Sequence, residues 1–277
     1  MADEYELPKG ELMAGKRGLV MGVANRQSVA YGIAAQLAAQ GAELAVSYIE
    51  ANEKRAKPLA ESLNALPIQA AVEDDASMDA AFAEVEQRFG TIDFLVHSLA
   101  FAEREQLKGS FVENTTRAGF HLAMDISVYS FVEASQCAAR LMGNGGSIVT
   151  MTYLGSERAI PNYNTMGVCK AALEAATRYI ARDLGPRGIR VNAISAGAMR
   201  TLSLAGIKGG RAMLSEGRAL SALREDTSKE GVAGCALWLL SDLGRSTTGE
   251  VVHVDAGFHM MGLPSEEEAP AAQDRSA

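Results

Sequence analysis

Residues 17–41 read RGLVMGVANRQSVAYGIAAQLAAQG, in which an apolar strand passes through a glycine turn into a helix. The run Arg17–Met21 is short and apolar, as a buried strand is. Val29–Gln40 carries small and apolar side chains at helical spacing, and Gly41 stands where a helix ends on glycine. A strand that turns through glycine into a helix is the first half of a βαβ unit, so this stretch predicts a parallel sheet.

The same alternation of apolar runs and helical patterns continues along the rest of the chain. The sequence predicts strands at Arg17–Met21, Glu43–Tyr48, Ile68–Val72, Ile92–His97, Ser147–Met151, Arg190–Ile194 and Val251–Val254. It predicts helices at Val29–Gln40, Asn52–Ala65, Met78–Phe89, Arg117–Leu141, Asn164–Leu184 and Lys229–Leu240. Strands that are apolar almost throughout belong in a sheet covered on both faces. We therefore expect a single-domain α/β fold, a Rossmann-like doubly wound parallel sheet of about seven strands with helices on both faces.

Local signals predict where several helices begin and end. Ser77 and Ser228 are typical helix N-caps, and Gly90 is typical of a helix C-terminus. Pro58 lies inside the second predicted helix and predicts a break there, because proline has no backbone N–H to donate.

Composition limits the class of protein. The chain has 277 residues, with 26 basic and 34 acidic side chains and a net charge of −8. This length can bury a large single core. The acidic balance argues against nucleic-acid binding, and no apolar run approaches the ~20 residues that span a bilayer. We expect an N-terminal leader over residues 1–14, one domain over 15–261, and an acidic, disordered tail over 262–277.

The cysteines and histidines carry no metal or disulfide pattern. Cys137, Cys169 and Cys235 lie far apart and form no CxxC pair, which indicates a reducing, cytoplasmic setting. The N-terminus is acidic and polar, unlike a signal peptide. The four histidines have no metal-ligand spacing, so we predict no metal site.

The turn after the first strand is a candidate dinucleotide site. Gly22 permits a sharp exit from the strand, and Ser28 can either cap the following helix or donate to a phosphate. Glu50, after the second strand, is a candidate ribose ligand. A glycine turn before a capped helix also occurs without a ligand. No arginine lies directly at this strand end to bind a 2′-phosphate, so NADH is favoured over NADPH.

A second candidate site follows the fifth strand. Tyr163 and Lys170 are seven residues apart, so on a helix both project from one face about 10 Å apart. Such a lysine can hold the nicotinamide ribose while the tyrosine reaches the substrate, and its ammonium would stabilise a phenolate or a strongly donating phenol. This spacing also occurs by chance, but the end of a central strand is where ligands bind in such folds.

These residues resemble the short-chain dehydrogenase/reductases and, within them, the bacterial NADH-dependent enoyl-acyl-carrier-protein reductases of type II fatty acid synthesis. The similar stretches are GVANRQSVAYGIA (22–34), DFLVHSLAFA (93–102), TYLGSERAIPNYNTMGVCKAALEA (152–175), RVNAISAG (190–197), RTLSLAGIK (200–208) and GEVVHVDAGF (249–258). Most short-chain reductases place lysine four residues after tyrosine. Here six residues separate Tyr163 from Lys170, and Tyr153 lies ten residues upstream of Tyr163, as in the enoyl reductases.

The resemblance implies a role for each matching residue. Tyr163 would donate a proton or stabilise the enolate, Lys170 would hold the ribose, and Tyr153 would assist at the substrate mouth, beside Ala102. The implied NADH-binding residues are Gly22, Ser28, Val29, Val72, Leu99, Lys170, Met199, Thr201, Leu202 and Ser203.

The resemblance also implies partners. The substrate would be a trans-2-enoyl thioester on acyl carrier protein, and the segment 199–218 would close over it as a lid. This segment is locally basic on an acidic protein, so the acidic carrier would dock near Lys208 and Arg211. The apolar faces of the helices predicted at Arg117–Leu141 and Asn164–Leu184 suggest an oligomer, which the family implies to be a homotetramer.

The chain departs from the family at several positions. Ile49 and Ala71 stand where glutamine and aspartate are frequent, which removes hydrogen-bond partners contributing about 1 kcal/mol each to cofactor binding. Ala100, Ala198 and Ala256 replace the usual glycine, proline and glycine.

Two alternative functions remain open from the residues alone. One is a ketoreductase on the same fold, which would need a serine partner and the four-residue spacing. The other is a non-catalytic NAD(H)-binding sensor, which has no need for Tyr153, Tyr163 and Lys170 together.

Overall fold

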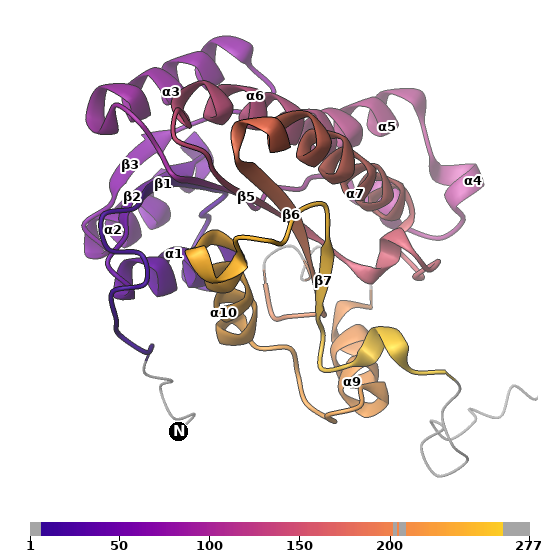
Figure 1. Cartoon of the computed structure of the whole chain (residues 1–277). Coiled ribbons are helices and arrows are strands. Elements are labelled where there is room, and N and C mark those ends of the chain that lie inside the picture. Colours follow the sequence, from indigo (N-terminus) through magenta and orange to yellow (C-terminus); the bar gives the residue numbers. More distant parts are fainter. Residues whose placement is uncertain (1–6, 202–203, 205–208, 263–277) are drawn as a thin grey trace, which may run out of the picture.

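Seven parallel strands form one sheet in the order β3-β2-β1-β4-β5-β6-β7 (Figure 1), which confirms the predicted fold class. The computed structural model describes residues 7–201, 204 and 209–262. The strands are β1 (Arg17–Met21), β2 (Glu43–Tyr48), β3 (Leu66–Gln69), β4 (Phe94–His97), β5 (Gly146–Thr152), β6 (Ile189–Ala196) and β7 (Val251–Val254).

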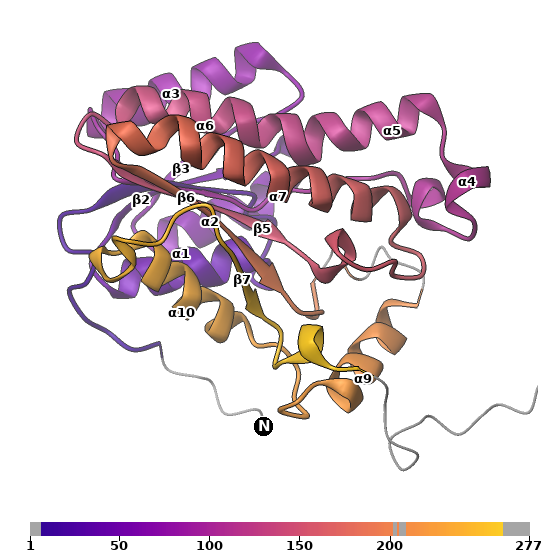
Figure 2. The same cartoon turned by 45° about the vertical axis from the view of Figure 1, so that its right-hand side comes forward.

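Helices cover both faces of this sheet (Figures 1 and 2). One face carries α1 (Val29–Ala39), α2 (Glu53–Ser62) and α10 (Lys229–Leu240). The other carries α3 (Asp75–Phe89), α5 (Arg117–Met124), α6 (Ser130–Leu141) and α7 (Asn164–Leu184). Two further helices, α4 (Phe111–Asn114) and α9 (Gly210–Leu220), lie beyond the carboxyl ends of the strands.

The two faces of the sheet bury alternate residues of each central strand. In β1, Val20 packs toward α1 and α10, whereas Leu19 and Met21 pack toward α3 and α6. In β4, Phe94 packs toward α1 and α10, whereas Leu95 packs toward α3 and α6. The five side chains named here in β1 and β4 are at most 1% exposed. Each such side chain contributes roughly 1.5–3 kcal/mol by its burial, which explains why these strands are apolar throughout.

The third strand begins two residues and ends three residues earlier than predicted, at Leu66–Gln69 rather than at Ile68–Val72. Its partner β2 ends at Tyr48, which pairs with Gln69. Residues after Gln69 therefore have no strand to pair with, and β3 ends there. Val72 therefore lies in the loop that follows. Pro67 is tolerated in β3 because an edge strand needs fewer ladder donors.

Of the four helix signals named above, Ser77 and Pro58 were wrong, whereas Ser228 and Gly90, the C-cap of α3, were right. The helix α3 is capped by Asp74, whose side chain accepts from the N–H of Ala76, while the Ser77 hydroxyl accepts from the N–H of Ala71. Pro58 does not break α2, because it is exposed and water can satisfy the carbonyl that loses its partner. Ser228 caps α10 as predicted, accepting from Gly231 N–H at 3.0 Å.

The helix predicted at Arg117–Leu141 contains a π turn, Asp125–Tyr129, which joins α5 to α6. The N–H of Ser130 donates to the carbonyl of Asp125, five residues earlier, instead of the usual four. Periodicity alone does not detect this single extra residue.

The N-terminal segment before β1 packs on the domain. Met13 is fully buried, and Gln40 donates through Nε2 to the carbonyl of Pro8 at 2.6 Å. Residues 263–277 of the predicted tail lie outside the described part of the chain.

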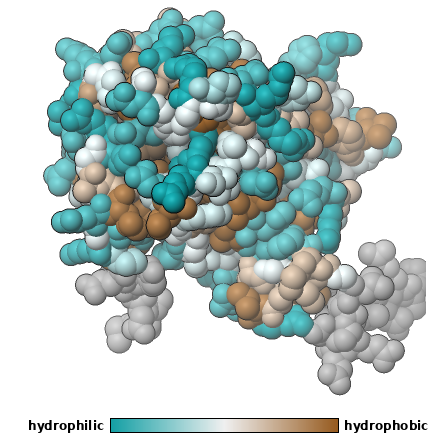
Figure 3. Space-filling view, in the orientation of Figure 1, coloured by the Kyte–Doolittle hydropathy of each residue, from teal (hydrophilic) through white to brown (hydrophobic). Residues whose placement is uncertain are grey.

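On the face seen in Figure 3, the surface is mainly hydrophilic over the upper part, where α3 and α6 lie. Figure 3 shows hydrophobic side chains gathered over the lower half of this face and at the tip around α4. Phe111 and Val112 of α4 are 40% and 86% exposed. Within residues 7–201, 204 and 209–262, no helix combines the length and apolarity needed to cross a membrane.

Candidate active site

The carboxyl ends of β1 and β4 mark the switch point of the sheet, where ligands bind in doubly wound folds. Gly22 follows β1 with a φ of +97°, and a Cβ at this position would lie 2.2 Å from the carbonyl oxygen of Ser98. Only glycine fits this conformation and this close approach. The turn after β1 can therefore pass directly against the backbone that follows β4, at the edge of the crevice.

The helix α1 begins at this turn. Asn25 organises the turn, because its Oδ1 accepts from the N–H groups of Gln27 and Ser28 at 2.8 and 3.1 Å. The Ser28 hydroxyl does not cap the helix but donates to the carbonyl of Asn25 at 2.5 Å. The positive end of the α1 dipole therefore faces the crevice without a side-chain cap from Ser28, an arrangement that suits an anion.

A pocket opens at this point and brings together most of the predicted site residues. It is lined by Gly22, Ser28, Val29, Leu99, Tyr153, Tyr163, Lys170, Met199 and Thr201. Ala100 and Ala198, two of the positions that depart from the family, line it as well.

Tyr163 is held by an unusual turn before α7. Asn162 and Asn164 on either side have φ values of +61° and +37°, a region that asparagine tolerates better than most residues. Asn164 donates through Nδ2 to the carbonyl of Gly109 at 3.2 Å, which ties the turn to the segment before α4. A Cβ on Gly155 would lie 2.4 Å from the Tyr163 ring, so glycine makes room for it.

Tyr153 contacts Tyr163 directly. Their ring centroids lie 4.9 Å apart at 67°, an edge-to-face contact. Tyr163 is only 8% exposed, and burial raises the pKa of its hydroxyl well above the ordinary value. Burial, with a further contribution from Asp255, also raises the pKa of Tyr153. Both phenols are therefore protonated at neutral pH.

Lys170 lies on α7 with its ammonium directed to the end of β5. It is 6% exposed, and Nζ donates to the carbonyl of Met151 at 2.7 Å. Burial lowers its pKa to about 8, and Glu174, one turn later, opposes this shift. Glu174 in turn accepts a hydrogen bond from the Thr152 hydroxyl at 2.6 Å. Of the two states predicted beside Lys170, a phenolate or a strongly donating phenol, burial of Tyr163 favours the phenol.

A second pocket adjoins the first on the side of α9. Both are lined by Tyr153, Gly197, Ala198 and Met213. The second extends to α9 and to the C-terminal turn, where Asp255 and Phe258 line it. Its lining, which includes Ile160, Met213 and Phe258, suits an apolar substrate chain better than a second nucleotide.

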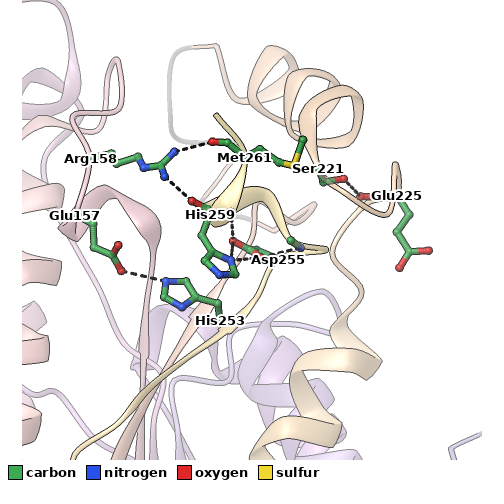
Figure 4. Close-up of polar contacts among 9 residues, drawn as sticks. Glu157, Arg158, Ser221, Glu225, His253, Asp255, His259 and Met261 are labelled. Carbon is green, nitrogen blue, oxygen red and sulfur yellow. Dashed lines mark hydrogen bonds and ion pairs between the residues drawn. The ribbon is translucent and has the colours of Figure 1, made fainter. Parts of the chain in front are cut away.

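The C-terminal turn after β7 is held by a polar cluster (Figure 4). The rings of His253 and His259 stack at 4.0 Å, and each is bonded to a carboxylate, Glu157 and Asp255 respectively, at 3.0 and 2.9 Å. Arg158 donates to the carbonyls of His259 and Met261. This cluster joins the turn to the loop between Tyr153 and Tyr163.

Some predicted residues do not line the first pocket. Val72 is buried in the core on the α3 side, and Ala102 packs against the cluster that contains Tyr163. Glu50 is exposed at the start of a short 3₁₀ turn.

Several predicted positions fall on residues that the structure describes only in part or not at all. Leu202, Ser203 and Lys208 lie outside the described residues, as does the side chain of Arg211 in α9.

The remaining pocket residues were not predicted, because most of them are small residues with no chemical signature. They are Ala24, Asn25, Ser98, Met151, Thr152, Ala196, Gly197, Leu204 and Met213. The signal that could have found them is position, since most lie at the carboxyl end of β1, β4, β5 or β6, or within a few residues after it. Among the described residues, no group of three or more histidine, cysteine or acidic side chains is placed to hold a metal ion.

Comparisons of the sequence agree on one family. The sequence model described as enoyl-(acyl carrier protein) reductase matches residues 22–259. The chain is 53% identical over 258 residues to the enoyl-acyl-carrier-protein reductase (NADH) 2 of Rhizobium meliloti. The aligned region covers 92% of this chain and 95% of that relative. It is 46% identical over 253 residues to the NADH-dependent reductase FabI of Escherichia coli, over 91% and 97% of the two chains.

Solved structures give the same result. The enoyl-acyl-carrier-protein reductase of Anaplasma phagocytophilum, in complex with NAD, superimposes with a TM-score of 0.90 at 49% identity, over 94% of this chain and 100% of that one. The Bacillus cereus reductase, in complex with NADP⁺ and an indole naphthyridinone, gives a TM-score of 0.89 at 46% identity, over 91% and 100%. This chain therefore belongs to the enoyl-acyl-carrier-protein reductase family.

Proposed function

We propose that this chain reduces trans-2-enoyl thioesters on acyl carrier protein to saturated acyl thioesters, with NADH as the reductant, in type II fatty acid synthesis. The observation that carries the proposal is the convergence of Tyr153, Tyr163 and Lys170 on the pocket at the switch point of the sheet. The named relatives are NADH-dependent reductases of this class, and one similar structure holds NAD.

The pocket fits a dinucleotide. The turn at Gly22 and the start of α1 are suited to the pyrophosphate, and Val29, Leu99 and Thr201 line the same pocket. We assign the same role to Ser28, Met199, Leu202 and Ser203, and to Val72 near the adenine. When bound, NADH would supply a hydride to the β-carbon, and a proton taken up afterwards at the α-carbon completes the saturated thioester.

Tyr163 acts on the charge that this reduction creates. As hydride arrives at the β-carbon, negative charge develops on the thioester oxygen, and a protonated phenol can donate a hydrogen bond to it. Such a bond is stronger in the transition state than in the ground state, because the oxyanion exists only once hydride transfer has begun. The raised pKa keeps the Tyr163 proton in place at neutral pH.

Lys170 and Tyr153 hold the reactants. The Lys170 ammonium, anchored on the Met151 carbonyl, has donors left to bind the nicotinamide ribose. Tyr153 supports the Tyr163 ring and lies where the two pockets meet, so it borders the thioester together with Ala102. The second pocket then takes the acyl chain, and the segment 199–218, with Met213 on α9, covers it as a lid.

The acyl carrier protein docks, on this proposal, near Lys208 and Arg211. Arg218, in the same segment, already forms an ion pair with Asp226. Reversing both charges, Lys208→Glu with Arg211→Glu, should raise KM for carrier-bound substrate and leave KM for a short free thioester unchanged. Unchanged turnover of the carrier-bound substrate would contradict this docking site.

We further propose a homotetramer in a cytosolic setting. Val168 and Tyr179 on α7, and Tyr129 on the π turn, are 39%, 69% and 50% exposed, and they offer an apolar face to a second copy. Light scattering that found a monomer would contradict the oligomer. The free thiols of all three cysteines support the reducing compartment.

The experiment that tests the function compares crotonyl and acetoacetyl thioesters, each with NADH and with NADPH. Tyr163→Phe should lower kcat for the crotonyl substrate by about 10²–10³, the usual effect of removing an oxyanion donor. Tyr31→Phe, a tyrosine of α1 that lines neither pocket, is the matched control and should keep full activity. Turnover of acetoacetyl substrate alone would make the chain a ketoreductase, and NADH binding without turnover would make it a sensor.

A further inference from the structure

The loop Ser98–Phe101 follows β4 directly and forms one wall of the first pocket. Ser98, Leu99 and Ala100 line the cofactor site, and the N–H of Ser98 still pairs with the carbonyl of Met21 at 3.2 Å. Beyond this bond the loop leaves the sheet, so its backbone needs other partners to keep one shape.

Ser127 supplies these partners at the far end of the loop. The N–H of Phe101 donates to Ser127 Oγ at 3.0 Å, and the Ser127 hydroxyl donates to the carbonyl of Phe101 at 3.1 Å. Ser127 is fully buried. One hydroxyl thus satisfies both backbone groups of Phe101, as a neighbouring strand would.

His97 fixes the near end of the loop. It is fully buried, with Nδ1 3.1 Å from Thr150 Oγ1 and Nε2 2.9 Å from Ser130 Oγ. The Ser130 hydroxyl donates to the carbonyl of Ile126 at 2.6 Å, so its oxygen accepts from His97 Nε2–H. Nδ1 then accepts from Thr150, and every polar group of this network is paired.

Both serines belong to the π turn or follow it directly. The turn spans Asp125–Tyr129, and the N–H of Ser130 closes it. Such a turn interrupts the regular helix and is often retained where it serves a site. Ser135 lies further along α6, is equally buried, and donates to the carbonyl of Phe131 at 2.6 Å, a bond that stays within the helix.

We infer that the π turn Asp125–Tyr129 holds the loop Ser98–Phe101 in the shape that accepts the cofactor, with Ser127 and Ser130 as positioning residues. Ser127 acts through Phe101, and Ser130 acts through His97. The inference rests on the proposed function, since NADH is taken as the ligand of this pocket.

The consequence is a defect in cofactor binding rather than in chemistry. Ser127→Ala removes the partner of two backbone groups of Phe101, so the loop samples other shapes and the binding-competent fraction falls. About tenfold weaker NADH binding is expected, the size of effect that losing one or two net hydrogen bonds produces. KM for NADH should rise by a similar factor, while kcat at saturating NADH changes little.

The experiment measures the NADH dissociation constant by titration calorimetry for the wild type, Ser127→Ala, Ser130→Ala and Ser135→Ala. Ser135→Ala is the matched control and should bind NADH like the wild type. Steady-state kinetics on the same four proteins separate KM from kcat. Should Ser127→Ala fail to fold, Ser130→Ala is judged by the same criteria.

Each outcome decides the matter. Weaker binding confined to Ser127→Ala and Ser130→Ala supports the inference. Unchanged binding in these variants overturns it, and so does an equal loss in Ser135→Ala, which would indicate general destabilisation of the helix. A wild-type chain that binds no NADH would instead overturn the proposed function, and this inference with it.

Discussion

His97 should make the folded chain sensitive to acid. Its ring is fully buried, and burial together with the nearby Lys170 ammonium lowers its pKa to about 3, from an ordinary value near 6.5. Between these two values the unfolded chain binds a proton at His97 that the folded chain does not. Above about pH 6.5 His97 therefore does not lower the free energy of unfolding, and below it this free energy falls as the pH approaches 3.

The magnitude follows from the shift. Each pH unit in this window is worth about 1.4 kcal/mol, so the step from pH 6.5 to pH 5 lowers the free energy of unfolding by about 2 kcal/mol through His97 alone. His97→Gln keeps a donor that can reach Ser130 but has no titrating group. The variant starts from lower stability, yet it should lose about 2 kcal/mol less than the wild type between pH 7 and pH 5.

Urea unfolding at the two pH values measures this difference, with the single tryptophan, Trp238, as the fluorescent probe. Groups other than His97 contribute equally to both proteins and cancel. His121→Gln, a substitution at an exposed position on α5, is the control and should leave the wild-type loss unchanged. Equal losses in the wild type and in His97→Gln would refute the reasoning.

Three further predictions concern single residues. Ala256 has a φ of +56°, a left-handed conformation that is strained for alanine and free for glycine. Ala256→Gly should therefore stabilise the chain by about 1 kcal/mol, measured as a higher urea midpoint, and a lower midpoint would show that the backbone is not strained here. Burial and nearby acidic residues raise the pKa of Glu133, whose Oε2 has no partner among the described residues. Glu133→Gln should therefore stabilise the chain at pH 7 and lose that gain as the pH falls below about 4, where the carboxyl becomes mostly protonated in the folded and the unfolded wild type alike. A gain that does not depend on pH would contradict this. The Lys170 pKa of about 8 predicts that kcat/KM falls as the pH rises through 8, and a flat profile to pH 9.5 would argue against its role.

Much of the fold could be predicted because its signals are local. The limits of β1, β2 and β7 agree with the apolar runs, and the end of α7 agrees with the helical pattern. The errors lie where the end of an element depends on a residue outside its own segment. Where β3 ends depends on where β2 ends, and Asp74 displaces Ser77 as a cap because Ser77 bonds back to Ala71. The sequence of a single segment does not show which hydrogen-bond partner a residue will take.

The site divides in the same way. Gly22, Tyr163 and Lys170 could be found because each has a distinctive residue type at the end of a strand or on a helix after it. Ser127 and His97 could not, since a serine inside a helix and a histidine at the end of a strand are common. Their contacts cross 26 and 33 residues of sequence, to Phe101 and Ser130.

The charges of the pocket explain why its tyrosine should be a phenol and not a phenolate. Lys170 is a buried cation, while His97 and Tyr163 are both held neutral by the same burial. Glu174, the acid one turn from Lys170, already accepts the Thr152 hydroxyl and is turned to the end of β5. A phenolate would neutralise the cation before the reaction began. With the proton retained, the negative charge that develops on the substrate oxygen meets both a donor and the Lys170 ammonium in a site of low dielectric, where such interactions are strongest.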